Sequence, residues 1–415
     1  MPSAPRLGRT LDTGDAVLVG LGSMIGAGVF TALAPAASAA GTGVLLALAL
    51  AALVAYCNAT ASARLAIRYP DAGGTYVYGR ERLGAFWGYL AGWGFVVGKV
   101  ASCAAMALTV VTYAAPQLPQ PWRGLVAAGV VAVLTGVNYA GVRKSALATR
   151  LLVAFSLLVL GFVVLAVVVG GDVSADRVSA TTATDPWGVV EAAGLLFFAF
   201  AGYARIATLG EEVRDPRRTI PRAIRAALAI VLAVYLVLTL AMLAQLGAAS
   251  LASQPDPLAH AVETTSWAAL APVVRVGAVV AACGALLTLL LGVSRTVLAM
   301  SRDGHLPRTL STVHPRHRVP RHAEPVVGAV VAVLATTADL RGVIGFSSFA
   351  VLVYYAIANV SAWTLGAGRL LPVVGLLGCV VLAVALPWTS VLSGVAVLAV
   401  GAAVYGCRTV LSRRR

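Results

Sequence analysis

Apolar residues along this chain gather in twelve runs that are separated by short polar connections. Most runs hold about 20 residues, the length of helix that crosses the roughly 30 Å hydrocarbon core of a bilayer. The runs are continuous and do not alternate residue by residue, which excludes a membrane-spanning β-barrel. We therefore predict an all-α polytopic membrane protein with twelve transmembrane helices. The runs cover residues 14–40, 43–66, 84–114, 122–141, 150–170, 186–210, 220–247, 266–294, 324–337, 342–365, 370–386 and 389–407.

The first run is interrupted between Val19 and Phe30, where four glycines and a serine stand in an otherwise apolar helix. Each glycine in a helix interior costs about 1 kcal/mol relative to alanine. Hydrocarbon also offers no water to the backbone groups that a break exposes. Such a break is tolerated where the unwound backbone is buried in protein or lines a polar cavity, as at the substrate sites of transporters.

The sixth run has a similar interruption over residues 194–205, five runs after the first. Two halves of five helices have opposite orientations in the membrane, because each half contains an odd number of spans. Two broken helices at equivalent positions therefore predict an inverted repeat with a substrate held between them at the midplane.

The basic residues predict the orientation of the chain. Of 415 residues, 60% are hydrophobic and 11% charged, and the net charge is +15. With the N-terminus inside, 24 of the 31 Lys and Arg lie in inner connections and three in outer ones, as the positive-inside rule requires. We expect both termini in the cytoplasm of a plasma-membrane protein, with anionic lipid headgroups rather than nucleic acid as the electrostatic partner. The exceptions are Arg123, Arg177 and Arg341 in outer connections and Lys99, Arg205, Arg275 and Arg295 within runs.

The N-terminus also has one feature of a signal peptide, because Arg6 and Arg9 precede a run that ends in small residues. An equally long apolar run follows directly, so we expect a first transmembrane helix instead.

We expect neither a metal nor a cofactor. The five cysteines lie singly within apolar runs, which is typical of packing residues. His314, His317 and His322 share one basic connection without cysteine or carboxylate companions, which favours a surface loop. The runs contain no HExxH, GxSxG or paired aspartates, which argues against an intramembrane enzyme, and no phosphate-binding loop indicates direct use of ATP.

Three short stretches stand out by their order and spacing: residues 22–30 (GSMIGAGVF), residues 197–203 (FFAFAGY) followed by 211–216 (EEVRDP), and residues 295–307 (RTVLAMSRDGHLP). Together they resemble signatures of the amino acid–polyamine–organocation (APC) superfamily, in its amino acid permease branch. The resemblance implies a leucine-transporter-like fold with a 5+5 inverted repeat and two peripheral helices. It also implies secondary transport of amino acids by alternating access, without covalent catalysis.

On this resemblance the chain divides into a transporter core, peripheral helices and two tails. The expected parts are a cytoplasmic tail over 1–13, a ten-helix core over 14–365 with repeats at about 14–170 and 186–365, two peripheral helices over 366–407, and a basic cytoplasmic tail over 408–415.

A broken helix suits a zwitterion, because free N–H groups at one half-helix bind a carboxylate and free C=O groups at the other bind an ammonium. Neither break has a carboxylate beside it, which favours a neutral amino acid. An alternative is that the glycines only permit close helix packing. The expected ligands are the amides of Gly26, Ala27 and Gly28 for the carboxylate, and carbonyls of Ser23, Met24, Ile25, Phe197, Phe198 and Phe200 for the ammonium. The resemblance also implies an aromatic gate at Phe198 and a side-chain pocket at Ala201.

Coupling to an ion is less directly indicated. In some proton-coupled relatives a lysine on the fifth helix contacts the first break, but here that position is Ser156. Lys99, within the third run, is an alternative titratable cation, because a buried lysine readily changes its charge state. Snorkelling or pairing with Glu191 are structural alternatives for Lys99. A sodium site that includes Ser156 and Thr288 is a further alternative.

The inner end of the sixth run carries Arg205, Glu211 and Glu212. We interpret them either as an ion-paired inner gate or as a solvated charge cluster. The favoured function is a proton-coupled symporter of neutral amino acids. An amino acid or amine exchanger, a sodium-coupled symporter, a channel and a nutrient sensor are the alternatives.

Overall fold

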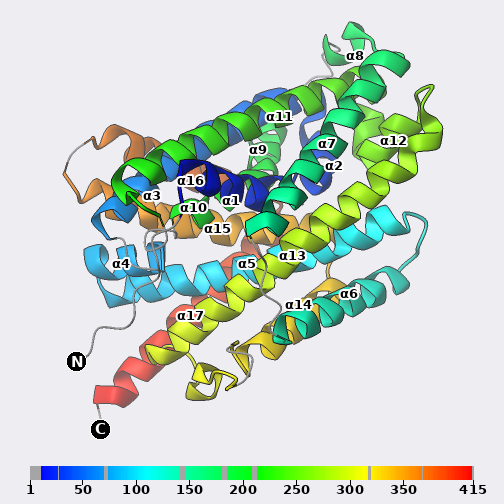
Figure 1. The fold of residues 1–415 in the computed structure, drawn as a ribbon. Coiled ribbons are helices and arrows are strands. Elements are labelled where there is room, and N and C mark those ends of the chain that lie inside the picture. Colours follow the sequence, from blue (N-terminus) through cyan, green and yellow to red (C-terminus); the bar gives the residue numbers. More distant parts are fainter. Residues whose placement is uncertain are drawn as a thin grey trace.

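The computed structural model describes residues 11–26, 28–69, 73–140, 146–179, 185–207, 213–315, 319–366 and 368–413. Within these ranges the protein is a bundle of helices (Figure 1), and its β-structure is limited to two isolated bridges, Leu11 with Val213 and Val313 with Pro320. Nine helical stretches of the described residues are long and apolar enough to cross a membrane. Three shorter apolar helices, at Thr13–Ile25, Ala323–Thr337 and Leu370–Ala385, accompany them. The prediction of an all-α polytopic membrane protein is confirmed.

Where they are described, all twelve predicted runs are helical, and several short helices lie between them. The first half contains α1 (Thr13–Ile25), α2 (Gly28–Ala40), η1 (Gly41–Gly43), α3 (Val44–Arg68), α4 (Thr75–Leu83), α5 (Ala85–Ala114), α6 (Trp122–Tyr139), α7 (Ala146–Gly170) and α8 (Ala175–Ser179). The second half contains α9 (Pro186–Phe200), η2 (Ala201–Tyr203), α10 (Ala204–Ala207), α11 (Pro216–Ser253), α12 (Pro257–Glu263), η3 (Ala268–Leu270), α13 (Ala271–Arg302), η4 (Arg308–Ser311), α14 (Ala323–Thr337) and α15 (Leu340–Trp363). The chain ends with α16 (Leu370–Ala385) and α17 (Trp388–Arg413).

Helices of the two halves pack on one another in an exchanged pattern. Helix α1 lies against α11, and α9 lies against α3, so each broken helix contacts the second long helix of the other half. Helix α5 packs on α13, and α6 packs on α14, in the same reciprocal way. This pattern is the one that two halves related by a two-fold axis produce.

Helix α5 runs through the middle of the bundle (Figure 1). Every residue from Gly98 to Tyr113 is buried, and most of them are small. Large apolar side chains instead point outward around the bundle, as at Leu158 and Leu370, where a hydrocarbon environment favours them. We call the end that carries α4 and the C-terminus of α17 the α4 end, and the opposite one the α12 end (Figure 1).

Candidate functional site

The first predicted break lies between α1, which ends at Ile25, and α2, which begins at Gly28. Both flanking glycines are required by close packing. A Cβ on Gly26 would lie 2.6 Å from Cβ of Ala285 on α13, and a Cβ on Gly28 would lie 2.6 Å from Cα of Ala199 on α9. Since real Cβ atoms do not approach so closely, only glycine lets the broken helix contact both neighbours.

The second break is milder than the first, because α9 passes into α10 through a single 3₁₀ turn, η2. Gly202 in this turn lies directly against the first break. A Cβ on Gly202 would lie 2.4 Å from the carbonyl oxygen of Ser23. The two interrupted helices are therefore in contact at Gly202–Ser23 and at Gly28–Ala199.

Two buried tyrosines bind the carbonyls of these breaks. The Tyr235 hydroxyl on α11 donates to the Met24 carbonyl at 2.8 Å and also lies 3.3 Å from the Ala199 carbonyl. The Tyr355 hydroxyl on α15 donates to the Ala201 carbonyl at 3.3 Å. Sequence reasoning missed both residues, although a tyrosine inside an apolar run needs a partner for its hydroxyl.

Comparison with known sequences identifies the family of this chain. The sequence model of a family described as amino acid permease matches residues 11–404. The chain belongs to the amino acid permease family. It is 63% identical to an uncharacterized transporter of Mycobacterium tuberculosis over 98% of this chain and 93% of the relative. It is 29% identical to the methylthioribose transporter of Bacillus subtilis over 79% of this chain and 75% of the relative, and 25% identical to that organism's branched-chain amino acid permease over 96% and 92%.

The three phenylalanines expected at the second break of this permease have different surroundings. Phe197 packs edge-on against Tyr355, with ring centroids 5.9 Å apart, and Phe200 packs edge-on against Tyr235 at 5.3 Å. Phe198 is 8% exposed, against 0% and 1% for the other two, so it is the least enclosed of the three.

The described residues among the expected ligands of the first break are packed against their neighbours. The Ser23 hydroxyl donates to the Val19 carbonyl at 2.9 Å, so this side chain is used within its own helix. Met24 and Ile25 are buried, while Ala27 lies outside the described residues. The carbonyls of Ser23 and Met24 face Gly202 and Tyr235 respectively, which brings the expected ammonium ligands beside the second break.

Lys99 is buried in the middle of α5, with 9% of its surface exposed. The structural alternative for this lysine is not found, because the Glu191 carboxylate instead accepts a hydrogen bond from Arg341 at 2.6 Å. Burial also rules out snorkelling to the surface. Lys99 is thus a titratable amine held inside the scaffold.

Ser156 and Thr288 are not brought together. Val159 of α7 lies against Gly277 of α13, and Leu152 lies against Gly284, so the two helices run antiparallel. This register places the levels of Ser156 and Thr288 about 12 Å apart along the helix axes. Their hydroxyls donate instead to the carbonyls four residues earlier, Leu152 at 2.8 Å and Gly284 at 2.9 Å.

Of the expected inner gate, only Arg205 can be placed, and it is exposed on α10. Glu211 and Glu212 lie outside the described residues. A different ion pair, between Arg150 at the start of α7 and Asp15 at the start of α1, links these helices. Asp15 and Asp12 also form a capping box that begins α1.

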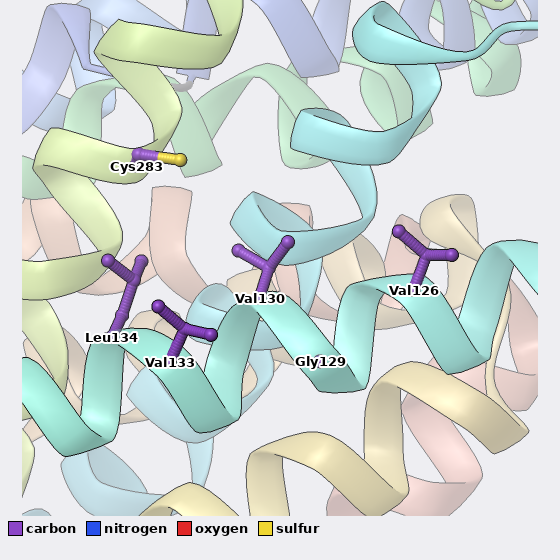
Figure 2. A pocket seen from close by; sticks show the side chains of 6 residues that line it. All are labelled: Val126, Gly129, Val130, Val133, Leu134 and Cys283. Atoms are coloured by element: carbon purple, nitrogen blue, oxygen red, sulfur yellow. The ribbon is translucent and has the colours of Figure 1, made fainter.

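An apolar hollow of about 500 Å³ lies on the outside of the bundle, where α6 faces Cys283 of α13 (Figure 2). Its walls carry no group that binds an ammonium or a carboxylate. Val126 and Val133 at its rim are exposed, as expected of a surface that faces lipid. This hollow therefore offers no polar side chain to an amino acid.

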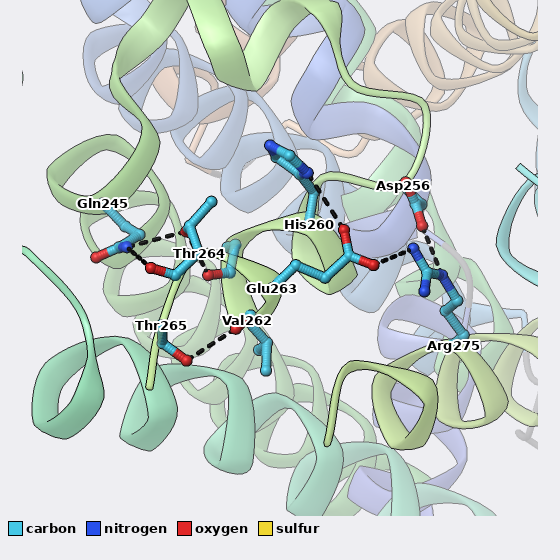
Figure 3. A network of polar contacts seen from close by, with 9 residues as sticks. Gln245, Asp256, His260, Val262, Glu263, Thr264, Thr265 and Arg275 are labelled. Atoms are coloured by element: carbon cyan, nitrogen blue, oxygen red, sulfur yellow. Dashed lines mark hydrogen bonds and ion pairs between the residues drawn. The ribbon is translucent and has the colours of Figure 1, made fainter. Parts of the chain in front are cut away.

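A network of charges holds α12 against α13 (Figure 3). The Arg275 guanidinium donates to Asp256 at 2.9 Å and to Glu263 at 2.7 Å, and His260 lies 3.4 Å from the other Glu263 oxygen. The sequence placed Arg275 within an apolar run without a partner. The structure places it near the start of α13, where it fixes the short helix α12 that covers this end of the bundle.

Proposed function

We propose that this permease is a secondary transporter of neutral amino acids that works by alternating access and is coupled to protons. The contact between the two interrupted helices carries the proposal. It brings the end of α1 and the start of α2 beside the end of α9, and the backbone groups at these helix ends are the donors and acceptors that a zwitterion requires.

In this proposal the substrate carboxylate binds the amides of Gly26, Ala27 and Gly28 at the start of α2, where the helix dipole also favours negative charge. The ammonium binds carbonyls at the end of α1 and α9. Ala201 lines the side-chain pocket, and Phe198 closes over the substrate. The chemistry of the breaks, with no carboxylate in either, supports a neutral substrate.

The repeats of the proposed transporter are residues 14–170 and 186–365, followed by two peripheral helices. We assign the α4 end to the cytoplasm and the α12 end to the outside of the plasma membrane, with both chain termini inside. The distribution of Lys and Arg supports this orientation.

Lys99 is the proposed coupling group, since its burial makes its charge state sensitive to its surroundings. An exchanger is the second candidate, because the register of α7 and α13 supplies no ion site from Ser156 and Thr288. A symporter accumulates substrate by using an ion gradient, whereas an exchanger uses the gradient of a preloaded substrate.

The deciding experiment is uptake into proteoliposomes under separately imposed pH and sodium gradients. The panel contains neutral, acidic and basic amino acids together with methylthioribose, the compound named in one relative. We expect a pH gradient to accumulate neutral amino acids. Accumulation that requires only preloaded substrate would replace symport by exchange, and uptake of methylthioribose alone would overturn the substrate class.

A further inference from the structure

Glu324 is a buried acid outside the substrate site. It is the second residue of α14 and only 1% exposed. Helix α14 packs on α5, α6 and α13, so the carboxyl lies within the scaffold rather than beside the breaks. Figure 1 shows α14 and α6 side by side.

Two contacts near this acid share a single donor hydrogen unless the carboxyl itself is protonated. Glu324 Oε2 and the Ser294 hydroxyl of α13 are hydrogen-bonded, and the same hydroxyl lies 3.1 Å from the Leu291 carbonyl. A serine hydroxyl has a single proton to donate. If Glu324 carries a proton, Oε2 donates to Ser294 and Ser294 donates to Leu291, so both contacts are satisfied.

The second carboxyl oxygen leads to the same state. Glu324 Oε1 is buried and, among the residues that the structure describes, has no hydrogen-bond partner. Leaving an ionised carboxylate oxygen unpaired inside a protein is more costly than leaving the oxygen of a neutral acid unpaired.

Other neighbours oppose this effect. The Asn138 amide of α6 and the Arg295 guanidinium of α13 favour the ionised form, as does the N-terminal position in α14. Cys103 faces the acid from α5, and α6 contributes the neutral amide of Asn138, whose nitrogen donates to the Leu287 carbonyl at 2.9 Å. Some neighbours of Glu324 thus favour the protonated carboxyl and others the ionised carboxylate, so a change in their arrangement can shift the acid between the two forms.

We propose that Glu324 is a proton-binding site of the transport cycle, protonated in the conformation described and deprotonated toward the cytoplasm in another. The proposal rests on the proposed proton-coupled function and adds a second titratable group to it. The exposed residues Arg321 and His322 directly precede α14, so Glu324 lies two residues from the surface at the end that we assign to the cytoplasm.

Helix α13 connects this proton site to the substrate site. Ala285 of α13 lies against Gly26 at the first break, and Ser294 binds Glu324 about 14 Å further along the same helix. A change in the Ser294–Glu324 contact therefore acts on the helix that supports the break.

Glu324→Gln tests the proposal, because glutamine keeps the size and neutrality of the protonated acid but cannot release a proton. We expect substrate exchange under symmetrical conditions to stay within about 2-fold of the wild type, and accumulation driven by a pH gradient to fall at least 10-fold. Glu81→Gln, on the exposed surface of α4, is the matched control and should leave both unchanged. Retention of pH-driven accumulation by Glu324→Gln would overturn the proposal.

A spectroscopic readout separates this proposal from the transport function. The infrared band of a protonated carboxylic acid should be present in the wild type at neutral pH and missing from Glu324→Gln. Identical spectra would overturn the protonated state. A wild type that shows the band but no pH-driven accumulation would instead overturn the coupling role and, with it, the proposed symport.

Discussion

The Tyr235 hydroxyl donates to the Met24 carbonyl at 2.8 Å and thereby ties α11 to the last turn of α1. The same hydroxyl lies 3.3 Å from the Ala199 carbonyl of α9, so one side chain bridges both interrupted helices. A carbonyl oxygen has two lone pairs. The Met24 carbonyl can therefore be oriented by Tyr235 and still accept a hydrogen bond from a substrate ammonium.

Tyr235→Phe should weaken substrate binding while the protein still folds. It removes one buried hydrogen bond, which is worth about 0.5–1.5 kcal/mol, so we expect the apparent affinity for substrate to fall about 2- to 12-fold. Concentration-dependent uptake measures the change. Tyr56→Phe, at an exposed position on α3, is the control. An unchanged affinity in Tyr235→Phe would show that this hydroxyl has no part in positioning the break.

Gly202→Ala should abolish most transport, because its new Cβ would press on the Ser23 carbonyl from 2.4 Å. Overpacking of this kind costs about 1–3 kcal/mol and would separate the two breaks. Gly161→Ala on α7 is the matched control, since a Cβ there meets nothing within 4 Å. Uptake and thermal unfolding should be measured on both variants. Normal uptake by Gly202→Ala would contradict the close approach.

Lys99→Ala should remove the response to a pH gradient while leaving exchange of substrate between the two sides. Lys99 is the buried titratable group of α5, and the alanine that replaces it cannot bind or release a proton. We expect pH-driven accumulation to fall at least 10-fold in proteoliposomes, with exchange across the same membranes as the internal control. Uptake that is insensitive to this substitution would eliminate Lys99 as the coupling group.

Arg275→Gln should destabilise the α12 end of the bundle. Asp256, whose side chain is 5% exposed, would lose its cation and be left buried with an unbalanced charge. We expect a loss on the order of 1–3 kcal/mol, seen as a lower thermal unfolding temperature in detergent. Arg225→Gln removes an exposed arginine whose hydrogen bond to the Pro221 carbonyl lies within α11, and it should have little effect. Equal effects of the two substitutions would contradict a structural role for the network.

Acidification should weaken the contact between α4 and the connection after α13. The Tyr76 hydroxyl is hydrogen-bonded to Asp303 and lies 2.9 Å from Nδ1 of His305. Burial lowers the pKa of the His305 imidazole, with Arg408 and Arg80 adding to the effect and Asp303 opposing it. The folded protein therefore binds fewer protons than the unfolded chain just below pH 6.5, so stability falls as the pH falls through this range.

His305→Gln should flatten this pH dependence, because glutamine does not titrate. Thermal unfolding measured from pH 7.5 to pH 5 tests the expectation. His260→Gln, at the opposite end of the bundle, is the control. A slope that persists in His305→Gln would assign the effect to another group.

The transmembrane helices were predictable because length and apolarity decide them locally. Both breaks were also predictable, since glycines in a spanning helix are costly unless they serve a close contact. The polar helix α4 was missed, because its sequence TYVYGRERL has no apolar run to indicate a membrane span. Helix α11 begins at Pro216, four residues before the predicted 220, because a helix can start in polar surroundings that hydrophobicity does not mark. It is kinked at Gly247, where φ is +71°, so the predicted end at 247 coincides with this kink, and a short further stretch reaches Ser253.

The partners of the polar side chains came from the tertiary structure alone. Tyr235 and Met24 are 211 residues apart, and Arg341 and Glu191 are 150 apart. Lys99, Glu324 and Arg275 each appeared in the sequence as a charge in or beside an apolar run, with nothing to identify its neighbours. The local pattern determines where a helix lies in the membrane, whereas the packing of distant helices decides which buried groups meet and hence which charges are balanced.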